Sequence, residues 1–268
     1  MEIRRFKIDV KIGIGQLKER NAERYPSDFY GYEKLMKMKK IKTLFFIALM
    51  TGWVASIGPG FAAEEGGERT ADDVLALLKE GNARFVDMKM EHPDENSARR
   101  EETAFYGQKP FAVVIGCSDS RVPVEMIFDR GIGDIFTVRV AGNIAVDSSV
   151  IGSLEYAAGH LHVPLLVILS HTQCGVAGAA VSGEKLEGSL ADIQEQFKSV
   201  VKQVMLEFPD LKDAALTDEV AKRNAFQVER DLRSGSPVIK DLADQGALKI
   251  VPALYDIKTG KVEWLEEK

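Results

Sequence analysis

The chain has 268 residues, a formal net charge of −6 and 45% hydrophobic residues, which is a globular composition with room for a full core. The negative charge is concentrated after Ala62, where 23 Lys and Arg stand against 35 Asp and Glu. An acidic domain of this kind repels phosphate backbones, so the composition argues against nucleic-acid binding.

The first part of the chain has the features of an export signal. Four lysines between positions 37 and 42 precede an apolar stretch at 43–57 and then the small residues of Gly60-Phe61-Ala62-Ala63. A basic start, a short apolar run and small residues are typical of a secretory signal peptide. We therefore predict a signal peptide at 36–62, cleaved after Ala62, and a periplasmic or secreted protein. A retained membrane anchor is the alternative, although Gly52 and Ser56 interrupt the run.

Residues 1–35 precede this signal, although signals begin at the N-terminus. We interpret them as an over-extended reading of the gene, or else as an unusually long leader. Residues 63–268 are expected to form a single domain, and no internal repeat or low-complexity segment interrupts them. No attachment to a membrane is expected after cleavage.

Two helices are predicted at the start of this domain. Thr70, followed by Asp72 and Asp73, is a helix start, because a capping hydroxyl and acidic first-turn residues stabilise a helix N-terminus. Apolar residues at helical spacing continue this helix to about position 88. The polar segment 91–97 indicates a loop, and a second helix is predicted at 97–106. Together the two helices form an N-terminal helical arm.

The middle of the chain alternates strands and helices. Apolar, β-branched runs begin at Phe111, Ile135 and Leu165, and such runs are typical of strands buried on both faces of a parallel sheet. A helix is predicted at 148–160, between the last two strands. This β-α-β alternation implies a parallel sheet with crossover helices. Asp129 and Asp134, which precede the second strand, are expected to be solvated loop charges.

The last part of the chain adds helices and strands. Amphipathic patterns predict helices at 190–208 and 218–233, and an apolar run predicts a strand at 248–254. Residues 255–265 are predicted to form a strand pair that turns at Lys258-Thr259-Gly260. The predicted fold class is α/β: a central, mostly parallel sheet flanked by helices, with an N-terminal helical arm and a C-terminal strand pair.

The strands that begin at Phe111 and Leu165 each lead to side chains that bind metals. Cys117 follows the first strand, and His171 and Cys174 follow the other. Ligands of open α/β sheets collect at the carboxyl ends of the strands, so these side chains are expected to meet. Two thiolates and one imidazole match a catalytic zinc site, which keeps its fourth position open. A disulfide between the two cysteines is the alternative, because export exposes them to an oxidising compartment.

Two charged side chains follow the first of these ligands. Asp119 is expected to accept a hydrogen bond from a zinc hydroxide and so to fix which lone pair faces a substrate. Arg121 can hold that carboxylate in a bidentate pair and keep it off the open metal position. An ordinary surface ion pair is the alternative.

The motif Cys117-Ser-Asp-Ser-Arg121, followed by His171-Thr-Gln-Cys-Gly175, resembles the signature of the β-class carbonic anhydrases. The resemblance covers nearly all of residues 63–268 and extends to Arg139-Val-Ala-Gly-Asn143 and Gly152-Ser-Leu-Glu-Tyr156. It implies one Zn²⁺ per chain with the ligands Cys117, His171 and Cys174. Asp119 and Arg121 then correspond to the catalytic pair of the family.

The resemblance also implies a substrate pocket. Gln108 matches the substrate-orienting glutamine of the plant-type subclass, and Phe136 and Tyr156 match aromatic residues of its apolar pocket. Because the family builds this pocket across a dimer interface, a homodimer or a dimer of dimers is expected. Val140 and Ala141 depart from the family pattern, which commonly has Asn and a larger Val at these positions.

Four further polar residues belong to the same region of the sequence. Arg139 and Asn143 are expected to brace the site or the interface rather than to touch substrate. His160 and His162 are interpreted as surface histidines near a helix end, with proton transfer as the alternative.

The implied activity is zinc-dependent, reversible hydration of carbon dioxide to bicarbonate and a proton, by attack of zinc-bound hydroxide. Two thiolates would cancel the formal charge of the metal, so activity is expected to rise through mildly alkaline pH. Hydrolysis of a related heterocumulene, carbonyl sulfide or carbon disulfide, is an alternative that uses the same nucleophile. A non-catalytic zinc-binding sensor module is a third hypothesis. The pair of Asp119 and Arg121 argues against it, because a structural zinc site is closed by a fourth protein ligand.

Overall fold

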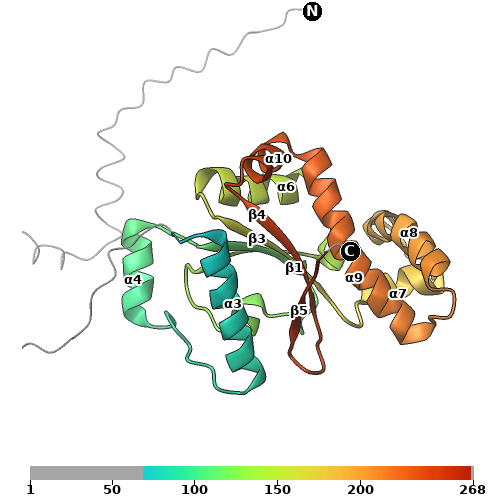
Figure 1. The fold of residues 1–268 in the computed structure, drawn as a ribbon, viewed down its shortest axis with the longest axis horizontal. Coiled ribbons are helices and arrows are strands. Elements are labelled where there is room, and N and C mark those ends of the chain that lie inside the picture. The colour runs from blue at the N-terminus through green and yellow to red at the C-terminus, as the bar shows by residue number, and fades with distance from the viewer. Residues whose placement is uncertain (1–68, 267–268) are drawn as a thin grey trace, which may run out of the picture. The chain divides into compact units, whose positions relative to one another are not determined.

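A five-stranded sheet of order β2-β1-β3-β4-β5 organises the computed structural model, which describes residues 69–266 (Figure 1). The strands are β1 (Ala112–Cys117), β2 (Ile135–Val140), β3 (Leu165–His171), β4 (Lys249–Tyr255) and β5 (Val262–Trp264). The first four strands are parallel, and β5 pairs antiparallel with β4. The predicted α/β class with a mostly parallel sheet is confirmed. The predictions for residues 1–35 and 36–62 lie outside the described residues.

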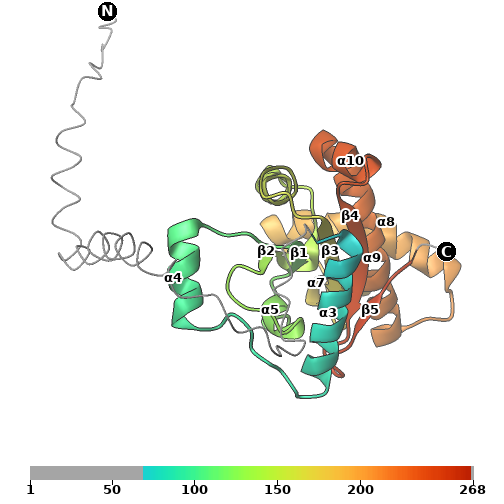
Figure 2. The ribbon, with the colours of Figure 1, turned by 60° about the vertical axis from the view of Figure 1, so that its left-hand side comes forward.

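Helices cover both faces of this sheet (Figure 2). On one face, α3 (Ala71–Val86) and α5 (Val124–Ile127) share a core with Ala112, Val114, Leu165 and Val167. The opposite core contains Val113, Ile115, Leu166 and Ile168. It is completed by α6 (Ser148–Glu155), α7 (Gly175–Ser182), α8 (Ser189–Glu207), α9 (Asp213–Gly235) and α10 (Pro237–Asp244). Successive side chains of a strand point to opposite faces, so β1 and β3 supply both cores and are buried throughout.

The predicted N-terminal helical arm is confirmed. Thr70 caps α3 in a capping box, in which its hydroxyl accepts from the backbone N–H of Asp73 at 3.2 Å and its own N–H donates to the Asp73 carboxylate at 3.0 Å. The second helix, α4 (Ser97–Tyr106), is capped by Asn96. No residue of α4 is buried within the described chain, and Phe105 and Tyr106 are each 71% exposed.

Several elements differ from the sequence-based expectation. The helices α5 and α10 were not predicted, and α9 begins at Asp213 rather than at position 218. The start of α10 has a recognisable signal, because Ser236 accepts from the N–H of Ile239 at 3.1 Å and Pro237 occupies the first turn. The C-terminal strand pair consists of β4 and β5, so only one of its strands falls within 255–265.

The expectation for two loop carboxylates was wrong. Asp129 is 1% exposed and Asp134 is 6% exposed. Asp129 accepts from Arg84 Nε at 2.6 Å and from the backbone N–H groups of Glu91 and His92 at 3.0 Å each. Asp134 accepts from the N–H of Gly131 at 3.1 Å and from Arg99 Nη2 at 3.4 Å, so both carboxylates fasten the helical arm to the sheet.

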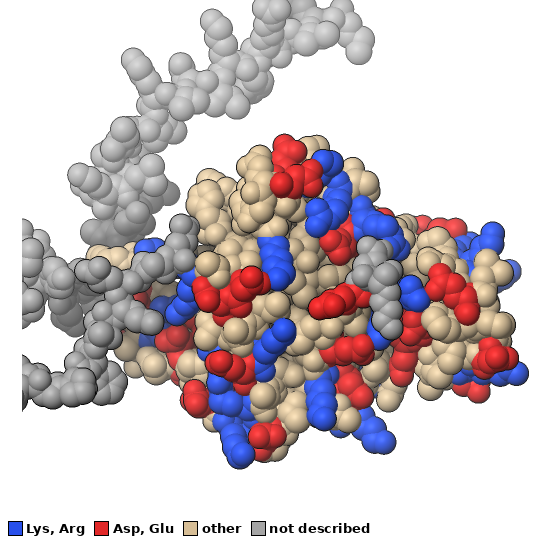
Figure 3. Space-filling model, in the orientation of Figure 1, with Lys and Arg blue, Asp and Glu red and all other residues tan. Residues whose placement is uncertain are grey.

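The surface of the described domain carries charges of both signs. On the face drawn in Figure 3, Asp and Glu are interspersed with Lys and Arg. Such mixing produces no extended positive field on this face. Among residues 69–266, no helix combines the length and the apolarity that a membrane span requires.

Candidate metal centre

Three ligand-type side chains converge at the carboxyl edge of the sheet. Cys117 ends β1, His171 ends the neighbouring strand β3, and Cys174 is the N-cap of α7. Their ligand atoms all lie within 4.8 Å of one another, and all three residues are buried. Both cysteines are free thiols. The expectation that these three residues meet is therefore confirmed.

His171 presents a ring nitrogen that lacks a protein partner. Its Nδ1 lies 2.9 Å from the carbonyl of Thr172, and because a carbonyl only accepts, Nδ1 carries the proton and donates. The lone pair is therefore on Nε2, which is buried and has no hydrogen-bond partner within the described chain. A buried polar atom without a partner is costly. An imidazole nitrogen freed in this way beside two thiols is a donor set that suits zinc.

The Cys117 sulfur lies in a setting that stabilises a thiolate. Its Sγ accepts backbone N–H bonds from Gly142 at 3.4 Å and from Asp119 at 3.5 Å. The pKa of Cys117 is lowered, chiefly by the thiol of Cys174, although burial opposes the shift. The same pairing raises the pKa of Cys174. The pair therefore releases one proton readily and retains the second, which a bound cation would help to displace.

Gly142 directs its N–H at this sulfur through a backbone conformation that favours glycine. It has φ +69° within η2 (Ala141–Asn143), the short 3₁₀ turn after β2. A Cβ at this position would lie 2.9 Å from the Phe197 ring. The carbonyl of Gly142 accepts from the side-chain amide of Asn224 in α9 at 3.1 Å. Close packing and this buried hydrogen bond together fix the turn against Cys117, His171 and Cys174, which we call the metal group.

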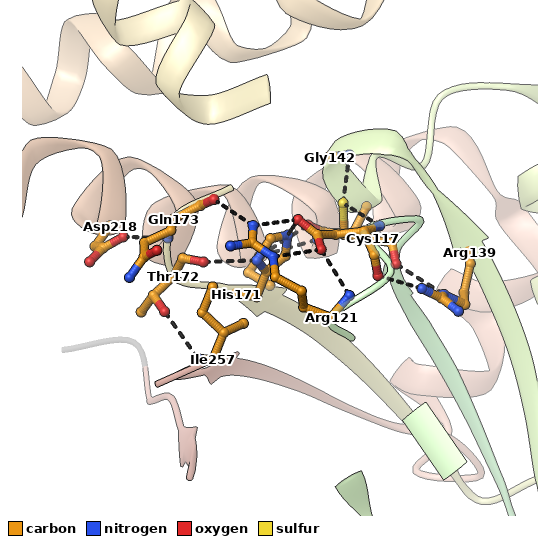
Figure 4. Close-up of polar contacts among 12 residues, drawn as sticks. Cys117, Arg121, Arg139, Gly142, His171, Thr172, Gln173, Asp218 and Ile257 are labelled. Atoms are coloured by element: carbon orange, nitrogen blue, oxygen red, sulfur yellow. Dashed lines mark hydrogen bonds and ion pairs between the residues drawn. The ribbon is translucent and has the colours of Figure 1, made fainter. Parts of the chain in front are cut away.

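Arg121, which Figure 4 draws near Cys117 and His171, forms a tightly bonded pair with Asp119. Arg121 donates to Oδ1 of Asp119 from Nε and from its own backbone N–H, both at 2.9 Å, and to Oδ2 from Nη2 at 2.7 Å. Oδ2 also lies 4.0 Å from His171 Nε2. The hydrogen bonds from Arg121 hold the pKa of Asp119 well below its usual range, against the effect of burial. The carboxylate thus stays ionised and faces the metal group.

The expected bracing residues contact the backbone and side chains around these groups. Arg139 donates from Nε to the carbonyl of Cys117 at 3.0 Å and from Nη2 to the carbonyl of Asp119 at 2.6 Å. Asn143 is 2% exposed and donates to Ser170 Oγ at 3.2 Å. Arg139 therefore fixes the turn after β1, and Asn143 ties the turn after β2 to β3.

The loop from His171 to Cys174 is held by residues that the sequence analysis missed. The N–H of Thr172 donates to the carbonyl of Tyr255 at 2.9 Å, and its hydroxyl accepts from the N–H of Ile257 at 3.2 Å. The N–H of Gln173 donates to Asp218 Oδ1 at 2.7 Å. Gly142 and Asn224 were missed as well. The only signal for Asn224 is an amide on the apolar stripe of an amphipathic helix, which calls for a buried partner.

The three residues assigned to a substrate pocket lie away from the metal group within one chain. Gln108 is exposed in the connection that precedes β1, at the edge of the sheet opposite to Cys117. Phe136 lies four residues before Val140, the register partner of Cys117, which is about 13 Å along the strand. Tyr156 packs on Phe136 with ring centroids 6.0 Å apart. Their substrate roles remain predictions that depend on a second chain.

The two expected surface histidines are both exposed. His160 stacks on the ring of Tyr156 with centroids 5.1 Å apart, within the π-helical turn η3 (Tyr156–His160). His162 has φ +56° in the connection to β3. Their location agrees with the interpretation as surface histidines at a helix end.

The chain is similar to known proteins over most of the described domain. The sequence model of the family described as carbonic anhydrase matches residues 112–262. Carbonic anhydrase 2 of Mycobacterium tuberculosis is 40% identical over 188 residues, which cover 69% of this chain and 87% of that protein. A carbonic anhydrase of Pseudomonas aeruginosa is 31% identical over 165 residues, covering 59% and 74%.

Solved structures with the same fold carry related descriptions. A β-carbonic anhydrase of Aspergillus fumigatus superposes with a TM-score of 0.59 at 29% identity, covering 73% of this chain and 90% of that one. A tetrameric β-carbonic anhydrase of Sordaria macrospora gives 0.59 at 25% identity, covering 72% and 97%. The curated relatives and these structures are carbonate dehydratases, a class of lyases.

Proposed function

Because the chain belongs to the carbonic anhydrase family, in its β class, we propose that it catalyses the reversible hydration of carbon dioxide to bicarbonate and a proton. The cofactor is one Zn²⁺ per chain, with Cys117, His171 and Cys174 as ligands. The observation that carries this proposal is the unpartnered, buried Nε2 of His171, which lies with two thiols next to the Asp119 carboxylate.

Each of these residues has a defined task. Zinc, when bound, lowers the pKa of a coordinated water toward neutrality and so supplies a nucleophile at neutral pH. Oδ2 of Asp119 faces the same space as His171 Nε2 and can accept the hydrogen of the attacking oxygen, which orients that oxygen toward carbon dioxide. Arg121 keeps Asp119 ionised and, by bonding both of its oxygens, keeps the carboxylate out of the open ligand position.

The substrate pocket of this proposal is completed by a second copy of the chain, as in the plant-type subclass. Gln108, Phe136 and Tyr156 of one chain then serve the metal centre of its partner in a homodimer or a dimer of dimers. Two observations on residues 69–266 support such an assembly: β2 is an edge strand, and α4 has no buried residue. The relatives from Sordaria macrospora are described as tetrameric.

The location proposed for the enzyme is the periplasm or the cell exterior. The support is the pattern at 36–62, with its basic start, apolar run and small residues before Ala63. Residues 63–268 then constitute the catalytic domain. An exported enzyme of this kind would supply bicarbonate or balance pH outside the cytoplasm.

The experiment that tests the activity uses protein that begins at Ala63. Zinc content is measured by elemental analysis, and hydration of carbon dioxide is followed by stopped flow on the same sample. Parallel assays with carbonyl sulfide and carbon disulfide compare the alternative substrates. We expect carbon dioxide to be turned over far faster than either; zinc-loaded protein without hydration activity would overturn the proposal.

A further inference from the structure

The loop between β3 and α7 is anchored from a helix that carries no metal ligand. Asp218 lies in α9 and accepts the N–H of Gln173 at 2.7 Å, as Figure 4 shows. Gln173 has φ +55°, in the left-handed region that residues with a Cβ rarely adopt. Such a conformation persists only where its surroundings determine it. The hydrogen bond that the N–H of Gln173 donates to Asp218 is one such constraint.

The other side of the same peptide segment reaches the catalytic pair. The carbonyl of Gln173 accepts from Arg121 Nη2 at 3.2 Å, and the same Nη2 donates to Oδ2 of Asp119 at 2.7 Å. The Arg121 side chain is 49% exposed, so burial alone does not fix it. The Gln173 carbonyl gives Arg121 a hydrogen-bond acceptor outside the ion pair. The carbonyl stays within bonding distance of Arg121 only while the loop keeps its conformation.

The start of α9 does not explain the place of Asp218 in this helix. Carboxylates cap a helix or complement its dipole in the first turn. The helix begins at Asp213, so Asp218 lies beyond that turn. Aspartate is also a poor former of helix interiors. The bond to Gln173 gives this residue a tertiary role instead.

We propose that Asp218 is a positioning residue for the catalytic pair: it holds the Gln173 carbonyl against Arg121, and Arg121 in turn keeps the Asp119 carboxylate out of the open ligand position. Its effect on turnover rests on the proposed function, whereas its effect on the loop and on Arg121 does not. The hydrogen bond of Asp218 goes to the backbone of Gln173 and not to a ligand side chain or to a residue assigned to the pocket, so we expect it to act on kcat rather than on KM.

Three variants test this role in the zinc-loaded protein. Asp218→Ala is expected to lower kcat about 10-fold with little change in KM, because the misplaced Asp119 orients the nucleophile less well. Asp218→Asn should restore most of kcat, since its amide oxygen can still accept from the N–H of Gln173. Glu219→Ala, the matched control, removes the neighbouring carboxylate of α9, which bonds Arg223, and should leave kcat unchanged.

A double-mutant cycle separates this route from a general structural effect. In an Arg121→Ala background, Asp218→Ala should cause no further loss of kcat, because its link to Asp119 is already cut. An equal, additive loss in that background would overturn the proposal. So would an Asp218→Ala variant with wild-type kcat.

Two measurements test the bond between Asp218 and Gln173 without any assay of activity. Hydrogen exchange at the Gln173 amide should accelerate in Asp218→Ala and stay slow in Glu219→Ala. The ¹⁵N relaxation of Arg121 Nε should report a side chain that is rigid in the wild type and Asp218→Asn but mobile in Asp218→Ala. An immobile Arg121 in Asp218→Ala would refute this proposal, whatever the substrate of the enzyme is. Wild-type protein without hydration activity would count against the proposed function alone.

Discussion

Oδ2 of Asp119 lies 4.0 Å from Nε2 of His171, yet the carboxylate is bonded to Arg121 rather than to the imidazole. At this distance a rotation of the Asp119 side chain would bring an oxygen among the metal ligands. In the proposed mechanism, the arginine would therefore determine which of two tasks the carboxylate has, that of a metal ligand or that of an acceptor for the attacking oxygen.

Arg121→Ala should retain zinc but lose most of its turnover, about 100-fold in kcat, because Asp119 is no longer held in its orientation. Zinc is measured by elemental analysis and kcat by stopped flow. Arg233→Ala is the matched control, since it removes an arginine that bonds Glu229 at 3.0 Å within α9. Near-normal turnover in Arg121→Ala would contradict the role assigned to the pair.

Hydration activity should rise from pH 6.5 to about pH 9. The pKa of Asp119 is lowered by Arg121, so this carboxylate is fully ionised above its unfolded pKa of about 3.9 and loses its charge only as pH falls through the lower folded pKa. Asp119 therefore contributes no acid limb in this range. The rise reflects a metal whose charge is offset by two thiolates, which makes it a weaker Lewis acid. The activity is measured against pH in buffers of constant ionic strength. An activity that does not change from acid to alkaline pH would contradict this prediction.

Gly142→Ala should weaken zinc binding and stability together. The left-handed φ costs a residue with a Cβ about 1 kcal/mol, and the predicted contact at 2.9 Å with Phe197 adds about 1–3 kcal/mol of overpacking. Displacement of the turn also moves the N–H that stabilises the Cys117 sulfur.

The control for this substitution is Gly183→Ala, at a glycine with φ +72° and no atom within 4 Å of an added Cβ. It should show the conformational cost alone and bind zinc like the wild type. Urea unfolding gives the stability, and competition with a chromophoric chelator gives the zinc affinity. Equal zinc affinities for the two variants would mean that Gly142 does not support the metal group.

Two buried carboxylates should respond in opposite ways to neutralisation. Burial raises the pKa of Asp129, but the bonds from Glu91, Arg84 and His92 outweigh it and leave the pKa below its usual value. Its charged form thus stabilises the fold above about pH 4, and this stability is lost as pH falls through the folded pKa. Asp129→Asn should cost about 2 kcal/mol at pH 7.

For Asp134, burial raises the pKa and the hydrogen bonds do not compensate. Its contribution to stability is full below the unfolded pKa and declines as pH rises through the folded pKa, so the ionised form is the unfavourable one. Asp134→Asn should therefore leave the free energy of unfolding at pH 7 unchanged or slightly higher. A loss as large as that of Asp129→Asn would show that the two carboxylates have the same role.

The fold and the convergence of Cys117, His171 and Cys174 could be predicted because their signals are local. Apolar, β-branched runs predicted β1 and β3, and the rule that parallel strands end at one edge brought Cys117 and His171 together. The packing behind the site is not local: Asn224 bonds a carbonyl 82 positions away, and Asp218 bonds an N–H 45 positions away. Nothing in the sequence near either residue indicates its partner.

The errors have a similar origin. Asp129 lies in a segment that the sequence indicates to be a loop. The helical arm and the loop after α3 fold over it and supply three hydrogen-bond donors from distant positions. A single sequence gives the polarity of a loop, whereas its burial depends on what packs on top. The same limit applies to Gln108 and Phe136, whose predicted roles depend on the surface of a second chain.

The most direct test of the central claim is a titration of zinc into chelator-stripped protein, with the initial rate of carbon dioxide hydration measured at each step. The rate should rise linearly from near zero and reach a plateau at one zinc per chain. Full activity in the stripped protein, or a protein that binds one zinc per chain and hydrates no carbon dioxide, would contradict the account.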